Sequence, residues 1–206
     1  MASNGSRGCR CCLCKLIFIV LVIIALAAFL FWLVFRPTMV DFHVTDANLT
    51  QFDYANNTLR YNLALNMTIH NPNKKIGIQY DNIEARAFFL HQRFHTQTFS
   101  SFYQGYKNTS VLNPLFKGQQ FVLLGTQEKV LSEFNKEKDS GIYNIDVKLY
   151  LRLRLKFQAI KVGNLIPGFT FGKNIIKPKF ECDLKIPLRN NNNGLGFETT
   201  YCHLRF

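Results

Sequence analysis

The sequence lacks the short motifs that mark common catalytic sites. It has no Gly-x-Ser-x-Gly elbow, no phosphate-binding glycine loop and no His-Glu-x-x-His pair. His91 and His95 are four residues apart, but the segment 88–99 around them has the pattern of a strand or loop. In a strand the two imidazoles would stand about 13 Å apart, too far to share one ion. We therefore predict no catalytic residue, no metal site and no cofactor.

Acidic residues are scarce, since the chain has 13 Asp and Glu against 25 Lys and Arg, for a formal net charge of +12. Residues 1–36 hold four basic residues and no acidic one, so residues 37–206 carry +8 of this charge. A basic surface of this kind suits acidic polysaccharide, anionic lipid head groups or acidic patches on proteins.

Charged residues, glycine and proline are all absent from residues 16–35, a run of twenty. A helix of that length spans about 30 Å, which matches the hydrocarbon core of a bilayer. Basic residues precede the run and acidic residues appear only after it. We therefore predict a cytosolic leader at 1–15, a single transmembrane helix at 16–35 and a domain outside the cytosol at 37–206. That orientation argues against nucleic acid as a partner.

Two other interpretations of the apolar run are open. Ala25-Leu26-Ala27 resembles the cleavage site of a signal peptide, but the apolar octet 28–35 would then begin the mature protein and make it poorly soluble. A soluble helix that is apolar all round would need a large surrounding core. Both alternatives fit the sequence less well than a membrane anchor does.

The six cysteines form two groups on either side of the run, with Cys9, Cys11, Cys12 and Cys14 before it and Cys182 and Cys202 after it. The second group is the only pair in an oxidising compartment, which predicts one disulfide that clamps the last strands, or else two separate buried thiols. The first group is spaced too closely for a structural zinc knuckle and lies beside the predicted membrane helix. It is a candidate for palmitoylation, with unmodified thiols as the alternative.

Four N-glycosylation acceptor motifs follow the run, and they begin at Asn48, Asn56, Asn66 and Asn108. Their number supports passage through the secretory route. A fifth match at Asn4 should be silent if the amino terminus is cytosolic.

Alternation of apolar and polar residues dominates the rest of the chain. It predicts strands at 39–44, 60–70, 83–89, 121–124, 145–157 and 180–188. One short helix is predicted at 126–136, where Val130, Leu131 and Phe134 are spaced for one face and Thr126 is placed to cap it. Turn signals such as Asn56-Asn57 separate these elements. We therefore predict a mainly β protein whose domain is an antiparallel β-sandwich.

The polar face of the strand at 145–157 carries a basic stripe, defined here as Lys148, Arg152, Arg154 and Lys156. This stripe is our candidate binding face. An equally good interpretation is an edge strand whose charges prevent aggregation.

Glu181 and Asp183 share the polar face of another strand, roughly 6.6 Å apart, which is a spacing that invites comparison with glycosidases. Exposed carboxylates on one strand are usually a solvated face. Because the sequence shows no aromatic cleft and no third catalytic group, we predict that this pair is not catalytic.

Four segments carry a resemblance to a known family: NPNKKIGIQYD at 71–81, FYQGYKNTS at 102–110, YNIDVKL at 143–149 and KPKFECDL at 177–184. Over nearly its whole length the chain resembles the plant non-race-specific disease resistance and harpin-induced-like family. The resemblance implies a fibronectin-like β-sandwich of the late-embryogenesis-abundant group-two kind, residence in the plasma membrane, and a role in responses to pathogens and abiotic stress. It implies no catalytic residues. Tyr106 stands where relatives often have histidine, so no function of an imidazole is expected there.

Two motifs within these segments have plain structural interpretations. Asn71-Pro72-Asn73 predicts a turn, because proline restricts the residue before it and asparagine favours turns. The segment from Tyr103 to Tyr106 predicts a loop hinged at Gly105. Either loop would also suit recognition.

Taken together, these patterns predict a non-enzymatic single-pass plasma-membrane protein. We expect its basic, glycosylated domain to bind a surface receptor or other defence proteins. The alternative is a membrane-to-wall tether or stress protectant that holds acidic wall polysaccharide by charge, which salt would release. A wall-polysaccharide enzyme is the weakest interpretation. The sequence favours no particular oligomeric state.

Overall fold

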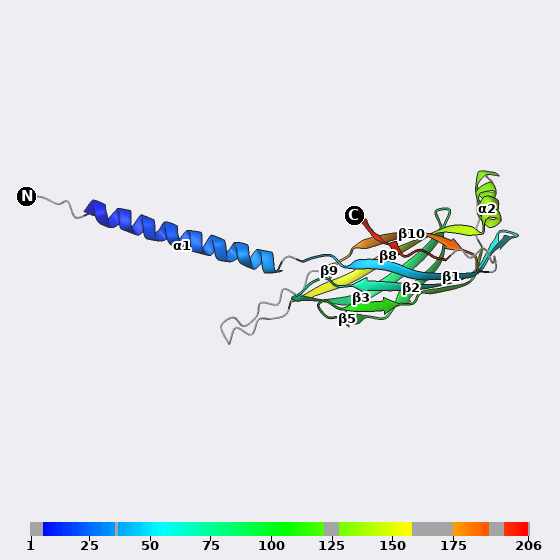
Figure 1. The fold of residues 1–206 in the computed structure, drawn as a ribbon, viewed down its shortest axis with the longest axis horizontal. Coiled ribbons are helices and arrows are strands. Elements are labelled where there is room, and N and C mark those ends of the chain that lie inside the picture. The colour runs from blue at the N-terminus through cyan, green and yellow to red at the C-terminus, as the bar shows by residue number, and fades with distance from the viewer. Residues whose placement is uncertain (1–5, 36, 122–127, 158–174, 190–195, 206) are drawn as a thin grey trace, which may run out of the picture. The chain divides into compact units, whose positions relative to one another are not determined.

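The computed structural model describes residues 6–35, 37–121, 128–157, 175–189 and 196–205. The chain divides into two compact units, residues 1–38 and residues 39–206. Each unit is described by itself below, and Figure 1 labels their elements.

The first unit contains one long helix, α1 (Ser6–Phe35). This helix includes all of the predicted segment 16–35 and begins earlier, so the leader cysteines lie in the same helix. Its large apolar side chains are strongly exposed, for example Leu16 at 63% and Phe18 at 67%. Among the residues that the structure describes, no helix meets the length and apolarity required to cross a membrane.

The second unit is a sandwich of two antiparallel sheets. The strands are β1 (Asp41–Ala55), β2 (Thr58–His70), β3 (Ile76–Phe89), β4 (Gln92–Phe99), β5 (Phe102–Gln104), β6 (Thr109–Leu112), β7 (Leu115–Phe121), β8 (Ile142–Phe157), β9 (Ile175–Ile176), β10 (Lys179–Pro187), β11 (Thr200–Tyr201) and β12 (His203–Arg205). Sheet A has the order β11-β1-β2-β6, and β7 also pairs with β2. Sheet B has the order β12-β10-β8-β3-β4, with β5 paired to β3 and β9 to β8. The predicted mainly β sandwich is thus confirmed.

Several predicted strands are correct in place but too short. The prediction at 39–44 covers only the start of β1, which continues to Ala55. Pairing of β1 with β2 shifts register between Val44 and Asp46 and again between Leu49 and Gln51. Each bulge interrupts the alternation of inward and outward side chains, so a search for strict period two stops at the first one. A similar shift at Tyr80 and Asn82 hides the first half of β3.

Other predictions fall partly outside the described residues. The strand predicted at 121–124 coincides with the structure only at Phe121, which ends β7, and residues 122–124 lie outside the described part. The predicted helix corresponds to α2 (Glu128–Ser140), whereas Thr126 and the side chain of Val130 lie outside that part. Phe134 is buried as expected, but Leu131 is 49% exposed, so that part of the prediction is wrong.

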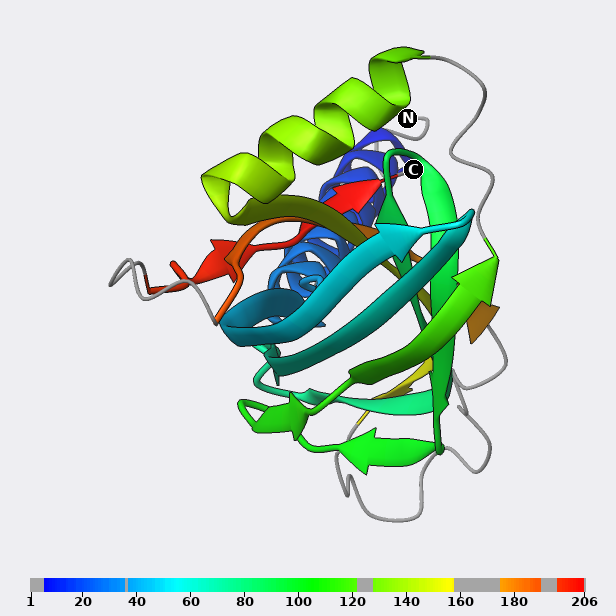
Figure 2. The same cartoon turned by 90° about the vertical axis from the view of Figure 1, so that its right-hand side faces the viewer.

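The interior of the sandwich is almost entirely apolar, as the two faces of stacked sheets require. Phe134 of α2 joins Phe52, Phe89 and Tyr143 in an aromatic cluster, with Phe52 centred 4.9 Å from Phe89 and 4.7 Å from Tyr143. Figure 2 shows α2 lying beside the strands of the sandwich. The helix ends at Gly141, whose φ of 69° is the left-handed conformation that glycine adopts without strain.

Candidate binding surface

The basic stripe lies on the outer face of sheet B. Its strand, β8, lies between β10 and β3 in the order of sheet B, so β8 is not an edge strand. β3 pairs with residues 145–157 of β8, β10 with residues 142–150, and β9 with Leu153 and Arg154. The interpretation of the stripe as the charged face of an edge strand is therefore wrong. Arg152, Arg154 and Lys156 are exposed and Lys148 is half-buried.

The four stripe residues differ in how far they are neutralised. Lys148 Nζ lies 2.6 Å from a carboxylate oxygen of Glu181, and Arg154 donates two hydrogen bonds to Asp81. Lys156 donates instead to the neutral amide oxygen of Gln79, at 3.1 Å. Among the described residues Arg152 has no ion pair. The free positive charge of the stripe thus resides chiefly at Arg152 and Lys156.

Glu181 is the centre of an ion-pair network on β10. Lys148 donates to it, Lys179 lies 3.4 Å away, and Arg205 of β12 donates at 2.8 Å. The hydrogen bond from Lys148 and the surrounding positive charge lower the pKa of Glu181 to about 2. A general acid needs a raised pKa, so this carboxyl is unsuited to protonate a leaving group.

Aromatic rings alternate with cations on the same face, which the sequence analysis did not anticipate. The guanidinium of Arg86 lies 4.2 Å from the ring centre of Tyr150, and Lys179 approaches the same ring at 5.7 Å. Lys148 lies 5.0 Å from the ring of Phe88, and Lys156 lies 5.3 Å from that of Tyr103. The signal was present in part, because Tyr150 occupies a polar-face position of the strand predicted at 145–157. Such cation–π contacts keep the rings in place on the surface.

The two motif loops form one buried amide network. Asn71 is 0% exposed and donates from Nδ2 to the carbonyls of Ile76 and Gly105, at 2.9 and 2.8 Å. Its Oδ1 accepts from the backbone and side chain of Asn73, at 3.1 and 2.9 Å. Gln104 is also 0% exposed, donates to the carbonyl of Ile69 at 2.8 Å and accepts from the hydroxyl of Tyr80 at 3.0 Å. These amides hold the loops together, so they are not themselves available for recognition.

The hinge predicted at Gly105 is wrong in its residue. A Cβ added at Gly105 would meet no atom within 4 Å, and the residue of this loop with a positive φ is Lys107, at 48°. The loop therefore turns two residues after its glycine.

His91 lies in the turn of a hairpin and His95 in the strand that follows the turn, so the two do not lie along one strand. Leu90 and His91 form the turn between β3 and β4 with φ of 46° and 64°, and His95 follows in β4. His95 Nδ1 lies 2.9 Å from the hydroxyl of Tyr61, and burial lowers the pKa of His95. No cluster suited to a metal ion occurs among the described residues.

All four predicted acceptor asparagines belong to sheet A or to its connections. Asn48 and Asn66 lie in β1 and β2, Asn56 in the turn between them, and Asn108 directly before β6. The last three are exposed, whereas Asn48 is half-buried and its Oδ1 is buried without a hydrogen-bond partner. Asn108 Oδ1 accepts from the backbone of Thr109 at 2.9 Å, which leaves Nδ2 as the free atom of its amide.

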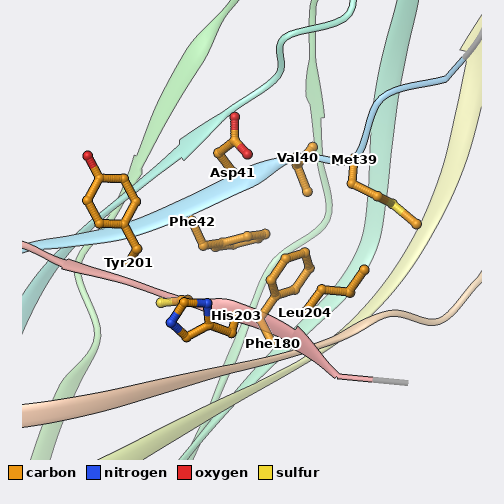
Figure 3. Close-up of a pocket in the computed structure, with 9 residues that line it drawn as sticks. Met39, Val40, Asp41, Phe42, Phe180, Tyr201, His203 and Leu204 are labelled. Atoms are coloured by element: carbon orange, nitrogen blue, oxygen red, sulfur yellow. The ribbon is translucent and has the colours of Figure 1, made fainter.

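The carboxyl-terminal strands join the two sheets. β11 pairs with β1 of sheet A and β12 pairs with β10 of sheet B, and Cys202 lies between them. Cys202 forms the predicted disulfide with Cys182, which is completely buried on β10. A shallow depression of about 200 Å³ lies at this seam. In Figure 3, Phe42 and Phe180 sit side by side in it, with ring centres 4.6 Å apart.

The leader cysteines are described only in part. Cys14 is exposed and free, while the side chains of Cys9, Cys11 and Cys12 lie outside the described residues, as does Asn4.

The described residues form an apolar helix followed by an antiparallel β-sandwich. The sandwich contains a disulfide, and the outer face of its sheet B carries cations and aromatic rings. No family profile matches the chain. It is 46% identical over 183 residues to NDR1/HIN1-like protein 3 of Arabidopsis thaliana, covering 87% of this chain and 74% of that protein. NDR1/HIN1-like protein 10 of the same plant is 45% identical over 179 residues, covering 85% and 73%. The chain therefore belongs to the NDR1/HIN1-like family.

Among solved structures, the solution structure of another Arabidopsis thaliana protein is 14% identical to this chain. The superposition covers 76% of this chain and 90% of that protein. Its TM-score of 0.38 is too low to bear on the fold.

Proposed function

We propose that this chain is a non-enzymatic, single-pass plasma-membrane protein of plant defence and stress responses, whose sheet B face binds other components of the cell surface. Membership in the NDR1/HIN1-like family supports the defence and stress context. Its sandwich is of the late-embryogenesis-abundant group-two kind. The observation that carries the binding role is the separation of acceptor asparagines on sheet A from cations on sheet B.

A glycan is bulky and hydrophilic, so an occupied acceptor covers the surface around it. Glycans at the sheet A sites would shield that side of the domain, while the strands of sheet B contain no acceptor motif. The outer face of sheet B is then the face on which a partner reaches protein atoms. Its interleaved cations and rings favour a partner with negative charge.

The decisive experiment for this face reverses one charge. Arg152→Glu is the sharpest variant, because Arg152 is exposed and its removal breaks no ion pair among the described residues. We expect lost or strongly weakened capture of anionic surface partners, and weaker salt dependence of what remains. Lys117→Glu, an exposed cation on β7 of sheet A, is the matched control. Unchanged binding in Arg152→Glu and in the double variant with Arg154→Glu would remove the stripe from the binding site.

The membrane anchor is supported by the uncharged run 16–35 and by the exposed apolar side chains of α1. Contiguous exposed apolar surface of this size calls for an apolar surrounding. The basic leader favours a cytosolic amino terminus, with residues 37–206 outside the cell. The clustered cysteines Cys9, Cys11, Cys12 and Cys14 are then accessible for palmitoylation, which thioester cleavage by hydroxylamine would detect.

The orientation is tested by removing N-linked glycans from the protein extracted from plant membranes. We expect a shift in gel mobility that is absent from a variant lacking Asn48, Asn56, Asn66 and Asn108. Single variants should show occupancy at the three exposed asparagines and none at Asn48, because a glycan on its half-buried amide would obstruct β1. An unshifted wild-type protein, with the half-buried Cys202 closed to an impermeant thiol reagent after reduction, would contradict an extracellular domain.

The second candidate function is a membrane-to-wall tether or stress protectant that holds acidic polysaccharide. One observation favours it specifically. At the end of β8 and the start of β3, the exposed residues Lys74, Lys75, Lys107 and Lys156 have no ion pair among the described residues. Release of the polymer by salt would indicate attachment by charge, whereas a shaped protein interface should persist.

Binding without catalysis is supported by the state of Glu181, which three cations hold ionised. A wall-polysaccharide enzyme using this carboxyl would lose hydrolysis in Glu181→Gln and Asp183→Asn. We expect both variants to show the same background rate of hydrolysis as the wild-type protein.

A further inference from the structure

A tyrosine lies over a glycine on the outer face of sheet B, near the start of β3. Tyr103 of β5 is 52% exposed, and its ring lies against Gly77, which is buried. A Cβ on Gly77 would lie 2.7 Å from Cζ and 2.8 Å from Cε2 of this ring, so the ring would have to move aside. Glycine at position 77 therefore allows the ring to occupy this place on the sheet while much of the side chain stays exposed.

A hydrogen-bonded cation lies over this ring. Lys156 Nζ lies 5.3 Å from the ring centre and donates to Gln79 Oε1 at 3.1 Å. Gln79 is itself oriented, because its Nε2 donates to the carbonyl of Phe102 at 3.1 Å. One of the three ammonium protons of Lys156 is thus used, and the others remain for a ligand.

More positive charge surrounds the pair. Lys74 and Lys75 precede β3, whose Gly77 is the register partner of Lys156, and Lys107 donates its backbone N–H to the carbonyl of Asn73 at 3.0 Å. All three lysines are exposed. The nearest acidic group on β3, Asp81, is engaged by Arg154. The surroundings of the ring are therefore cationic.

We propose that Tyr103, Lys156 and Gln79 form a subsite for an acidic sugar of the uronate class within a polysaccharide. The C–H groups of the sugar stack on the exposed part of the Tyr103 ring, since an aromatic face is electron-rich and attracts such hydrogens. The sugar carboxylate accepts from Lys156, and neighbouring residues of the polymer meet Lys74, Lys75 and Lys107. This subsite rests on the proposed tether function and gives it a defined site, beyond attraction by charge alone.

An acidic sugar is favoured over other anions because the site combines a flat exposed ring with a hydrogen-bonded cation. A surface that binds by charge alone needs neither an exposed aromatic ring nor a glycine beneath that ring. Anionic lipid head groups share the charge, so vesicles form a separate arm of the test.

The test uses the full chain in detergent micelles and polygalacturonate as the probe. Polyglutamate supplies charge without a sugar ring, and fully methyl-esterified polygalacturonate supplies the ring without charge. Vesicles containing phosphatidylglycerol supply anionic head groups. Tyr103→Ala removes the ring, Gly77→Ala displaces it, and Lys156→Gln removes the cation. Tyr201→Ala, a 63% exposed tyrosine on β11, and Lys117→Gln, an exposed lysine on β7 of sheet A, are the matched controls.

We expect Tyr103→Ala to weaken polygalacturonate binding about tenfold and to leave polyglutamate binding unchanged, since stacking and its cation–π contact together are worth about that factor. Gly77→Ala should resemble it, while Tyr103→Phe keeps most of the affinity. Lys156→Gln should weaken binding about fivefold. The methyl ester should bind little, and both controls should match the wild-type protein. Circular dichroism confirms that each variant is folded, and Tyr103→Ala decides the matter if Gly77→Ala does not fold.

Equal losses for both polyanions, or full binding by Tyr103→Ala, would overturn the subsite while leaving a charge-based tether intact. Binding to vesicles but not to polygalacturonate would overturn it in favour of lipid. A wild-type chain that binds no acidic polysaccharide at any salt concentration would instead overturn the tether function itself.

Discussion

The outer surfaces of the two sheets differ in charge and in the modifications they are built to carry. The strands of sheet A contain two Lys and Arg residues, Arg60 and Lys117, against three acidic residues on β1, Asp41, Asp46 and Asp53. The strands of sheet B contain nine Lys and Arg residues, namely Arg86, Arg93, Lys148, Arg152, Arg154, Lys156, Lys179, Lys185 and Arg205, against five acidic ones.

All four acceptor motifs after the apolar helix fall on sheet A. The sandwich therefore separates a side suited to glycans from a side suited to anionic partners, although both kinds of residue are interspersed along the chain. The net charge of +12 for the whole chain does not reveal this separation, because only the strands of sheet B carry more cations than acids.

The largest expected effect comes from moving a glycan to the wrong face. Arg152→Asn with Arg154→Thr creates an acceptor motif on β8, and an occupied site there should abolish partner binding by covering sheet B. Arg152→Gln with Arg154→Thr removes the same charges without the acceptor and should retain some binding. Gln119→Asn with Phe121→Thr creates a motif at exposed positions of β7 on sheet A and should leave binding intact. A gel first confirms that each acceptor carries a glycan, and a pull-down then measures partner binding. Equal binding by both acceptor variants would contradict the assignment of partner binding to sheet B.

The link between the faces is tested by the disulfide. Cys182→Ser with Cys202→Ser opens a covalent bond between residues 20 apart and releases the strands that join sheets A and B. We expect the free energy of unfolding to fall by about 3 kcal/mol. Urea denaturation followed by circular dichroism measures it. If the free energy of unfolding falls by less than a single exposed substitution would cause, β11 and β12 remain paired without the disulfide.

The sheets are also joined through Gln104. Its amide on β5 of sheet B binds the carbonyl of Ile69 on β2 of sheet A and the hydroxyl of Tyr80. Gln104→Ala leaves these buried groups without a partner, which should cost about 2 kcal/mol. Thermal unfolding compares it with Gln119→Ala, an exposed glutamine on β7 expected to change stability by no more than about 0.5 kcal/mol.

The charge network of sheet B should make stability depend on pH. Because the folded protein lowers the pKa of Glu181 from 4.5 to about 2, its contribution is fully present above pH 4.5 and is lost as the pH falls toward 2. Denaturation midpoints measured across this interval should decline in the wild-type protein. The Glu181→Gln variant should be less stable at pH 6, and its denaturation midpoint should decline less as the pH falls. If the midpoints of the two proteins decline in parallel, other carboxyls cause the acid sensitivity.

The smallest effect concerns the two hairpin turns. Sheet A turns through Asn56 and Asn57, which tolerate positive φ, whereas sheet B turns through Leu90 and His91, which do not. His91→Gly should stabilise the domain by up to about 1 kcal/mol. Asn57→Gly should change stability by a few tenths of that amount. A destabilised His91→Gly would show that the imidazole makes a contact worth more than the strain.

The strands with uninterrupted alternation were predictable, and those with bulges or short edges were not. β2, β8 and β10 alternate throughout, so their predicted limits agree with the structure within three residues. β5, β6, β11 and β12 are too short for a pattern to emerge and exist because a neighbouring strand offers free backbone groups. The residues of the basic stripe were predictable from the sequence. Its position in the sheet was not, because strand order depends on contacts between residues far apart in the chain.

The sequence by itself determined the apolar helix segment, the alternating strands, the pairing of the two distal cysteines and the family. These depend on local periodicity, composition and short motifs, which the chain carries wherever it folds. Only the tertiary structure decided that β8 is interior, that the acceptor asparagines and the cations occupy opposite sheets, and that Tyr103 lies on Gly77 beside Lys156. Each of these depends on register between distant strands, and a shift of one residue would have turned every such side chain to the other face.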